Sequence, residues 1–202
     1  MNASIFKRIF SFLIDSIFIL ALVVFLFRFV ARPIIEDSID NFDALYASFI
    51  DAQDTRFDEV VLVQENFDAG LITEAEYTER LNEIDEAYNE NYAEETEAYA
   101  TFLYTSALYF ILSLTLLNYL YQGFTRGKTV GRRFAKLRLA GPVNWWTLLL
   151  REVFWKSIYW VFTLGFGIFI DFILISLTNQ RKTIRDYLTK TKVVVEDTLY
   201  PI

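Results

Sequence analysis

An apolar stretch of membrane-spanning length near the N-terminus constrains the fold of this chain most. Residues from Phe10 to Val30 are apolar except for Asp15, Arg28 and the serines. A helix needs roughly 20 such residues to cross a bilayer. A signal peptide has a shorter apolar core and a small-residue cleavage site, and no A-x-A-like site follows here. The stretch therefore predicts a retained transmembrane helix.

A second apolar stretch, Ala98 to Tyr121, predicts another transmembrane helix. Tyrosines near its ends suit the aromatic belt at a membrane interface, and Asn118 is its most polar residue. Composition agrees with this class, because 54% of the residues are apolar and 18% are aromatic.

The third apolar region, Trp145 to Thr178, is interrupted by charged residues. These are Arg151, Glu152, Lys156 and Asp171. Two alternatives remain open. Either residues 145–156 lie along the interface and residues 157–178 cross once, or the region enters the membrane and returns, with a bend at Gly165 and Gly167.

The charges of the chain are segregated. Residues 36–97 contain 20 acidic and two basic residues, so this block is near −18 and the remainder near +11. Basic residues precede the first predicted span and follow the second. The positive-inside rule therefore places the N-terminus in the cytoplasm, the acidic block outside, and the basic C-terminal tail inside.

The acidic block has helical periodicity. Phe42, Leu45, Tyr46 and Phe49 recur at helical spacing, and a second such run follows from Tyr77. Between the runs, Gly70 suits a helix end, and Thr73 with Glu76 forms a capping box. We expect a helical hairpin, with its acids forming a solvated surface rather than a calcium site.

Basic residues after the second span predict contacts with lipid headgroups. They are Arg126, Lys128, Arg132 and Arg133. The segments "KLRLA" (136–140) and "TKVVVED" (191–197) both predict short strands, which can pair only on one side of the membrane. The membrane explains these charges, so we expect no nucleic-acid partner.

Three segments in order resemble the RDD family of integral membrane proteins. They are "FKRIFSFLIDSIFIL" (6–20), "GKTVGRRFAKLRLAG" (127–141) and "NQRKTIRDYLTKTKVVVED" (179–197). The resemblance covers roughly residues 3–35 and 100–197. It implies Arg8 as the family arginine, with Asp15 and Asp186 as the two aspartates. Asp171 competes for the last role.

The chain departs from the family pattern near Asp186. Arg185 stands where the family often has histidine, and Thr189-Lys190-Thr191 where it often has "AGT". The segment 36–98 is longer than the usual family loop, so we expect it to be a lineage-specific insertion. The resemblance implies either ion transport or membership of a larger membrane assembly.

An ionised Asp15 within an apolar helix needs a compensating partner. The first interpretation is a structural anchor, with Asp15 paired to Arg8, Arg151 or Arg133. The second is a cation or proton site formed by Asp15 with Asp171 or Asp186.

We therefore expect an all-α membrane protein with three apolar helical regions, the third re-entrant or kinked. Its parts are residues 1–35 with the first span, residues 36–98 with the extracytoplasmic acidic hairpin, and the remainder of the domain, 99–202. The sequence lacks histidine and cysteine and contains no catalytic constellation, so we expect no enzyme, no cofactor and no metal site.

The expected role is an accessory or scaffolding subunit in the bacterial plasma membrane. Its partners would be lipids and other membrane proteins, or further copies of itself. The alternative is a small cation transporter or antiporter subunit of the Na⁺/H⁺ type.

Overall fold

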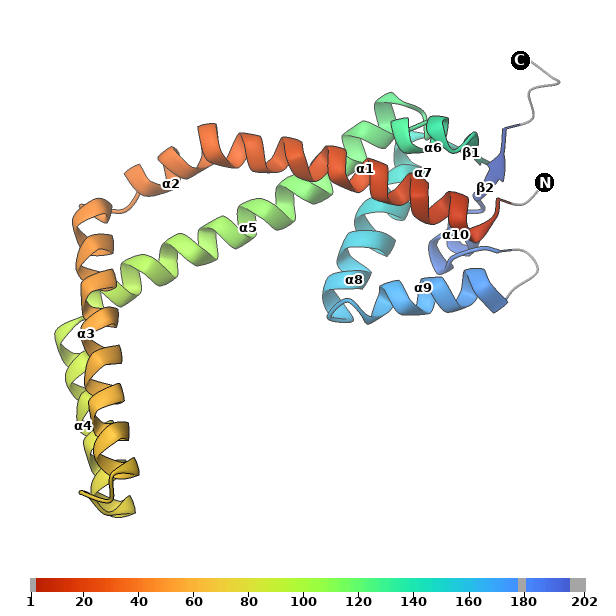
Figure 1. Cartoon of the computed structure of the whole chain (residues 1–202). Coiled ribbons are helices and arrows are strands. Elements are labelled where there is room, and N and C mark those ends of the chain that lie inside the picture. The colour runs from red at the N-terminus through yellow and green to blue at the C-terminus, as the bar shows by residue number, and fades with distance from the viewer. Residues whose placement is uncertain (1–2, 178–180, 197–202) are drawn as a thin grey trace. The chain divides into compact units, whose positions relative to one another are not determined.

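Two helices of the computed structural model are long and apolar enough to cross a membrane, as the sequence predicts (Figure 1). The first comprises α1 (Ile5–Leu26), a π-helical stretch η1 (Phe27–Ala31) and α2 (Arg32–Asp37), 33 residues in all. The second is α5 (Ala93–Phe124), with 32 residues. At about 1.5 Å per residue, each exceeds the roughly 30 Å of a bilayer core.

The chain divides into two units, of which the structure describes residues 3–177 and 181–196. One unit consists of Met1–Leu26 with Phe110–Ile202, and the other is Phe27–Tyr109. Both boundaries fall inside the two long helices. Large apolar side chains lie on the surface of α1, where Phe10 is 55% and Ile17 66% exposed. Such an apolar surface suits contact with lipid.

In the second unit, α3 (Phe42–Asp68) and α4 (Glu74–Asn91) pack against each other as an antiparallel pair (Figure 1). The Tyr77 hydroxyl donates to Gln64 at 2.7 Å, and the Gln53 amide donates to the Tyr88 hydroxyl at 2.6 Å. The predicted capping box is confirmed, because Thr73 and Glu76 exchange both of its hydrogen bonds. Nearby, Gly70 adopts φ +70° in the turn.

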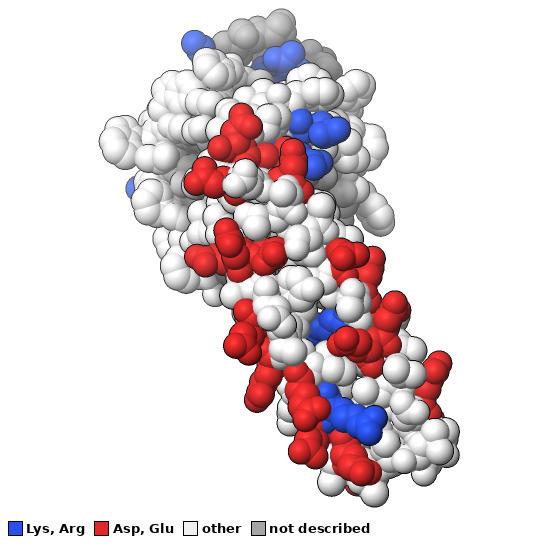
Figure 2. Space-filling view, turned by 90° about the vertical axis from the view of Figure 1, so that its left-hand side faces the viewer, with Lys and Arg blue, Asp and Glu red and all other residues white. Residues whose placement is uncertain are grey.

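The outer surface of α3 and α4 is acidic (Figure 2). Glu79, Glu83 and Glu86 are exposed and follow one another at helical spacing along α4. Arg56 on α3 pairs with Asp85 at 2.6 Å, which is an exposed ion pair. Exposed pairs of this kind contribute little to stability, about 0–1 kcal/mol. The hairpin is therefore held by its aromatic contacts, such as Phe67 with Tyr77.

The first unit contains the predicted strand pair. Strand β1 (Leu137–Ala140) pairs antiparallel with β2 (Lys192–Val195), and Leu137 lies opposite Val195. The strand prediction is thereby confirmed over these residues, and Asp197 lies outside the described residues. Residues of both strands belong to a buried apolar cluster, composed of Ala3, Ala135, Leu137, Leu139, Leu148 and Val193.

The third apolar region is bent. It comprises α7 (Trp145–Leu148), a π-helical stretch η2 (Leu149–Ile158), α8 (Tyr159–Phe162) and α9 (Phe166–Leu177). Leu164 and Gly165 separate α8 from α9 with φ values of +49° and +87°. A single helix over 157–178 is therefore not observed. With 12 residues, α9 measures about 18 Å, too short to cross alone.

The segment after α9 lies beside the start of α1. Short helix α10 (Ile184–Leu188) precedes β2, and Arg8 of α1 donates to the Val193 carbonyl of β2 at 2.9 Å. Arg181 donates to the Ala3 carbonyl at 3.3 Å. The start of α1 and the described end of the chain therefore share one end of this unit, where β1 also lies (Figure 1).

Candidate functional site

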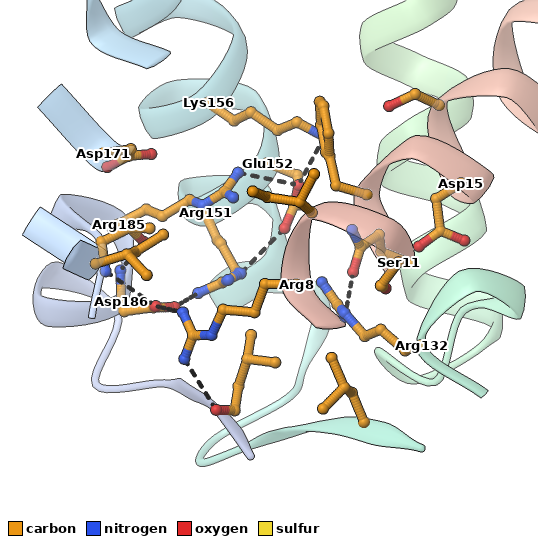
Figure 3. A pocket seen from close by; sticks show the side chains of 18 of the residues that line it. Arg8, Ser11, Asp15, Arg132, Arg151, Glu152, Lys156, Asp171, Arg185 and Asp186 are labelled. Atoms are coloured by element: carbon orange, nitrogen blue, oxygen red, sulfur yellow. Dashed lines mark hydrogen bonds and ion pairs between the residues drawn. The ribbon is translucent and has the colours of Figure 1, made fainter. Parts of the chain in front are cut away.

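A cavity of about 180 Å³ lies within the first unit (Figure 3). It is bounded by α1, α5, α6 (Val130–Phe134), η2, α9, α10 and both strands. Nine charged residues line the cavity: Arg8, Asp15, Arg132, Arg151, Glu152, Lys156, Asp171, Arg185 and Asp186. Since charges are rarely buried without partners, this cavity is the candidate functional site.

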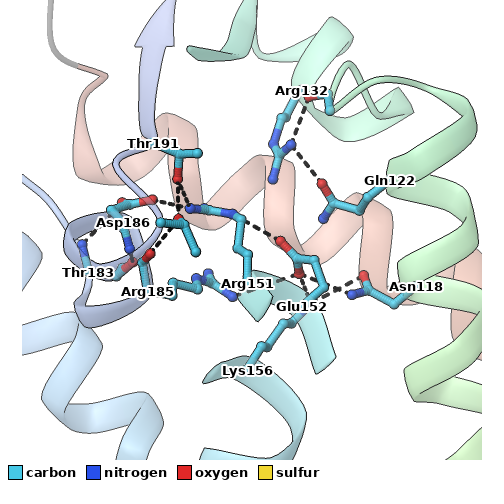
Figure 4. A network of polar contacts seen from close by, with 12 residues as sticks. Asn118, Gln122, Arg132, Arg151, Glu152, Lys156, Thr183, Arg185, Asp186 and Thr191 are labelled. Atoms are coloured by element: carbon cyan, nitrogen blue, oxygen red, sulfur yellow. Dashed lines mark hydrogen bonds and ion pairs between the residues drawn. The ribbon is translucent and has the colours of Figure 1, made fainter. Parts of the chain in front are cut away.

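Arg151 and Asp186 form the centre of the polar network (Figure 4). Arg151 is 1% exposed, and its Nη1 pairs with the Asp186 carboxylate and donates to the Thr191 hydroxyl. Arg8 lies 3.7 Å from the other Asp186 oxygen. This arrangement ties η2, α10 and α1 together through one carboxylate.

Local structure holds Asp186 in place. Its backbone N–H donates to Thr183 at 3.2 Å, while its carboxylate accepts from the Thr183 N–H at 3.1 Å, forming a capping box for α10. Burial alone would raise its pKa. The charges of Arg151 and Arg185, with these hydrogen bonds, prevail and hold the pKa of Asp186 below its ordinary value.

Glu152 is the second buried carboxylate of the network. Its Oε1 accepts from Arg151 Nε at 3.0 Å, and its Oε2 accepts from the Asn118 amide at 3.1 Å. Lys156 at 3.6 Å and Arg185 at 4.0 Å are further ion partners. Glu152 therefore connects η2 to both α5 and α10.

Asp15 does not pair with an arginine. The predicted ion pair of Asp15 with Arg8, Arg151 or Arg133 is therefore wrong. No cation of the described residues lies within 4.0 Å of the Asp15 carboxylate in an ion pair. Instead it accepts from the Thr129 hydroxyl at 2.6 Å, the Gly131 N–H at 2.8 Å and the Tyr121 hydroxyl at 3.1 Å. Backbone and hydroxyl donors at the start of α6 thus replace the expected guanidinium.

The predicted partners of Asp15 are engaged elsewhere. Arg8 and Arg151 meet at Asp186, and Arg133 is exposed and donates to the Lys128 carbonyl at 3.0 Å. In Figure 3, Asp15 lies on the α6 side of the cavity and Asp186 on the opposite side. All three carboxylates line the same cavity, so a joint ion site of Asp15 with Asp171 or Asp186 stays a prediction.

Asp171 on α9 is the least engaged carboxylate of the cavity. It accepts from the Ile184 N–H at 3.1 Å, and no cation of the described chain forms an ion pair with it. This contact joins α9 to the start of α10.

The predicted headgroup contacts divide into two classes. Arg126, Lys128 and Arg133 are exposed, which leaves their contact with lipid headgroups a prediction. Arg132 is buried, at 8% exposure, so it does not lie on the surface as predicted. Its Nη1 donates to Gln122 at 2.8 Å and to the Gly127 carbonyl at 2.7 Å. Burial and the charge of Arg151 lower the pKa of Arg132 to about 10, so it stays charged at neutral pH.

Glu152 and Lys156 are members of the site that the sequence prediction did not include. Their signal is present, because two charges four residues apart interrupt an apolar region and share one helical face. Thr129 and Gly131 were missed as partners of Asp15. The segment containing them has a recognisable pattern, but only the fold brings it to α1.

The comparison with protein families decides the identity of the chain. The model of the RDD family matches residues 2–190, nearly the whole length. This chain belongs to the RDD family. With its two long apolar helices, it is a membrane protein. Neither a curated protein nor a solved structure matches the chain.

In this RDD protein, two of the three residues that the resemblance implied come together. Arg8 pairs with Asp186, whereas Asp15 organises the start of α6 on the other side of the cavity. The matched range also includes α3 and α4, so a lineage-specific insertion of that hairpin stays a prediction.

Proposed function

We propose that this RDD protein is a non-enzymatic subunit that supports a larger assembly in the bacterial plasma membrane. The observation that carries the proposal is the state of the buried carboxylates. Asp186 and Glu152 are each held by arginines, and Asp15 by three neutral donors. Carboxylates satisfied in this way hold elements together, whereas a transported cation needs carboxylates that can release their partners.

The proposed topology relative to the membrane follows from the elements that lie together at one end of the first unit. The start of α1, β1 and β2 lie together, and the basic residues Arg126, Lys128 and Arg133 are exposed nearby in the chain. The positive-inside rule favours the cytoplasm for this end. The bend at Leu164 and Gly165 lets the third region enter and return. The acidic hairpin then lies outside, where it is available to a partner.

The exposed acidic face of α4 is the proposed docking surface for that partner. Glu79, Glu83 and Glu86 lie on one side of the helix, and charged faces of this kind steer association with a basic surface. A chain of 23.7 kDa with two long apolar helices encloses little by itself, which also favours an assembly.

The test is purification of the tagged protein from its native membrane in mild detergent. We expect a different protein to co-purify in a fixed ratio. The triple change of Glu79, Glu83 and Glu86 to lysine should abolish co-purification, while aspartate at the same positions keeps the charge and should retain it. A wild-type particle containing this chain alone would contradict the accessory role.

Cation transport is the second candidate, and Asp171 is the observation that favours it. This carboxylate lines the cavity and lacks an ion pair among the described residues. The test is Na⁺ or proton flux into liposomes that contain this protein alone. Flux that disappears in Asp171→Asn would replace the scaffolding proposal, and flux equal to that of empty liposomes would exclude the second candidate.

A further inference from the structure

Five cations and four carboxylates line the cavity, so its lining has a net charge of +1, and the ion pairs are shared unevenly. Four cations, Arg8, Arg151, Lys156 and Arg185, share two carboxylates, Glu152 and Asp186. Arg132 is a fifth cation at the same cavity. No carboxylate of the described residues lies within ion-pair distance of Arg132.

Two guanidinium groups at this cavity have donors to spare. Arg132 uses only Nη1 among its side-chain nitrogens, so its Nε and Nη2 have no hydrogen-bond partner within the described chain. Arg8 Nε is buried and also lacks a partner there. A buried donor without an acceptor is costly, and this cost applies to Arg8 Nε. Arg132 lines the cavity, and its two spare donors are not among the fully buried unpartnered atoms of the described residues. A negatively charged acceptor in the cavity would accept hydrogen bonds from Arg8 Nε and from the spare donors of Arg132.

We propose that the cavity binds a phosphate group, held by Arg132 and Arg8. The planar fork of arginine suits the oxygens of a phosphate, with which it can form two parallel hydrogen bonds. A cavity of about 180 Å³ has the volume of several water molecules, at about 30 Å³ each, and so accommodates a tetrahedral oxyanion.

The two arginines approach the cavity from different elements. Arg8 projects from α1 and Arg132 from α6, and both are labelled around the open space in Figure 3. Lys156 from η2 adds a further ammonium group at the wall. Donors fixed on separate helices define a site in three dimensions, and burial strengthens each interaction with the ligand.

The phosphate has two chemical sources, an acidic phospholipid or free inorganic phosphate. The experiment has an arm for each. In the first, calorimetry measures the binding of inorganic phosphate to the full chain in detergent, with chloride at equal ionic strength as reference. In the second, native mass spectrometry measures the retention of phosphatidic acid against diacylglycerol, which lacks the phosphate.

We expect the wild-type protein to bind inorganic phosphate, phosphatidic acid or both. Arg132→Gln should weaken that binding by roughly tenfold or more, because a charge-assisted hydrogen bond contributes enough for one such factor. Arg80→Gln is the control, since Arg80 is an exposed arginine of α4 that neither lines the cavity nor belongs to the predicted headgroup contacts, and its binding should equal that of the wild type.

Arg132→Lys keeps the positive charge but lacks the planar guanidinium group. It replaces Arg132→Gln in the binding test if that variant fails to fold. Its affinity should lie clearly below that of the wild type. Binding in neither arm by the wild-type protein would overturn the proposal, as would equal binding by the wild-type protein and the Arg132 variants.

Discussion

Asp15 shows how a carboxylate is stabilised in an apolar helix without a cation. Its three donors come from Thr129, Gly131 and Tyr121, so the negative charge is balanced by hydrogen bonds and by the start of α6. The sequence correctly indicates that Asp15 needs a partner. It favours arginine because guanidinium groups are abundant in the basic segments, whereas backbone donors leave no mark in the sequence.

Asp15→Asn should lower the stability of the domain. Asparagine has one acceptor oxygen in place of two and presents its NH₂ group to donors. The loss should be about 1.5–3 kcal/mol, the contribution of a hydrogen bond to a charged group. Thermal unfolding in detergent measures it. Asp68→Asn on the hairpin, whose carboxylate is exposed, is the control. An unchanged unfolding temperature in Asp15→Asn would contradict the anchoring role.

At the scale of elements, the contact between α1 and α6 depends on Gly131. A Cβ placed there would lie 2.1 Å from the Ser11 carbonyl oxygen and 2.9 Å from Asp15 Cγ. Because the Ser11 oxygen belongs to the α1 backbone, the two helices would have to separate. Gly131→Ala should therefore cost about 1–3 kcal/mol or more, as overpacking does.

The comparison for this variant is Gly70→Ala in the hairpin turn. Gly70 has open space around its Cα, so only the strain of its φ of +70° applies, about 1–2 kcal/mol. Circular dichroism melts of both variants give the difference. Gly131→Ala should also weaken the contacts at Asp15, so its loss should exceed that of Gly70→Ala. The opposite order would mean that α1 and α6 do not pack as described.

The capping box of α4 provides a second element-scale prediction. Thr73→Ala removes the acceptor for the Glu76 N–H and should cost about 0.5–2 kcal/mol. Thr78→Ala is the matched control, because Thr78 is exposed within the same helix and, among the described residues, its hydroxyl bonds only to the Glu74 carbonyl. Equal melting curves for the two variants would show that the cap does not stabilise the hairpin.

For the molecule as a whole, much of the secondary structure can be predicted from local patterns. The two long apolar helices, the Thr73 cap and the pairing of β1 with β2 all follow from periodicity, capping residues and β-branched runs. The partners of Asp15 and the burial of Arg132 cannot, because they depend on how α6 docks onto α1. Topology relative to the membrane also stays a prediction.

The pH dependence of stability should reflect Asp186. Its pKa is below the ordinary aspartate value of 3.8 in the folded protein, so the unfolded state binds protons first as the pH falls. The stabilisation is therefore fully present above the unfolded pKa and is lost as the pH falls through the folded pKa. Unfolding temperature measured from pH 7 down to about pH 2 should show this acid limb below the unfolded pKa, and Asp186→Asn should reduce it. If the unfolding temperature of Asp186→Asn falls with pH as steeply as that of the wild type, the acid sensitivity belongs to other carboxylates.

The central claim is that the buried charges hold the first unit together, and a double-mutant cycle of Arg151 and Asp186 tests it most directly. Thermal unfolding in detergent is measured for the wild type, Arg151→Met, Asp186→Leu and the double variant. Each single change should cost about 3–5 kcal/mol, because it leaves a buried charge without its partner. The double variant should lose clearly less than the two losses added together. Strict additivity, or single variants as stable as the wild type, would contradict the claim.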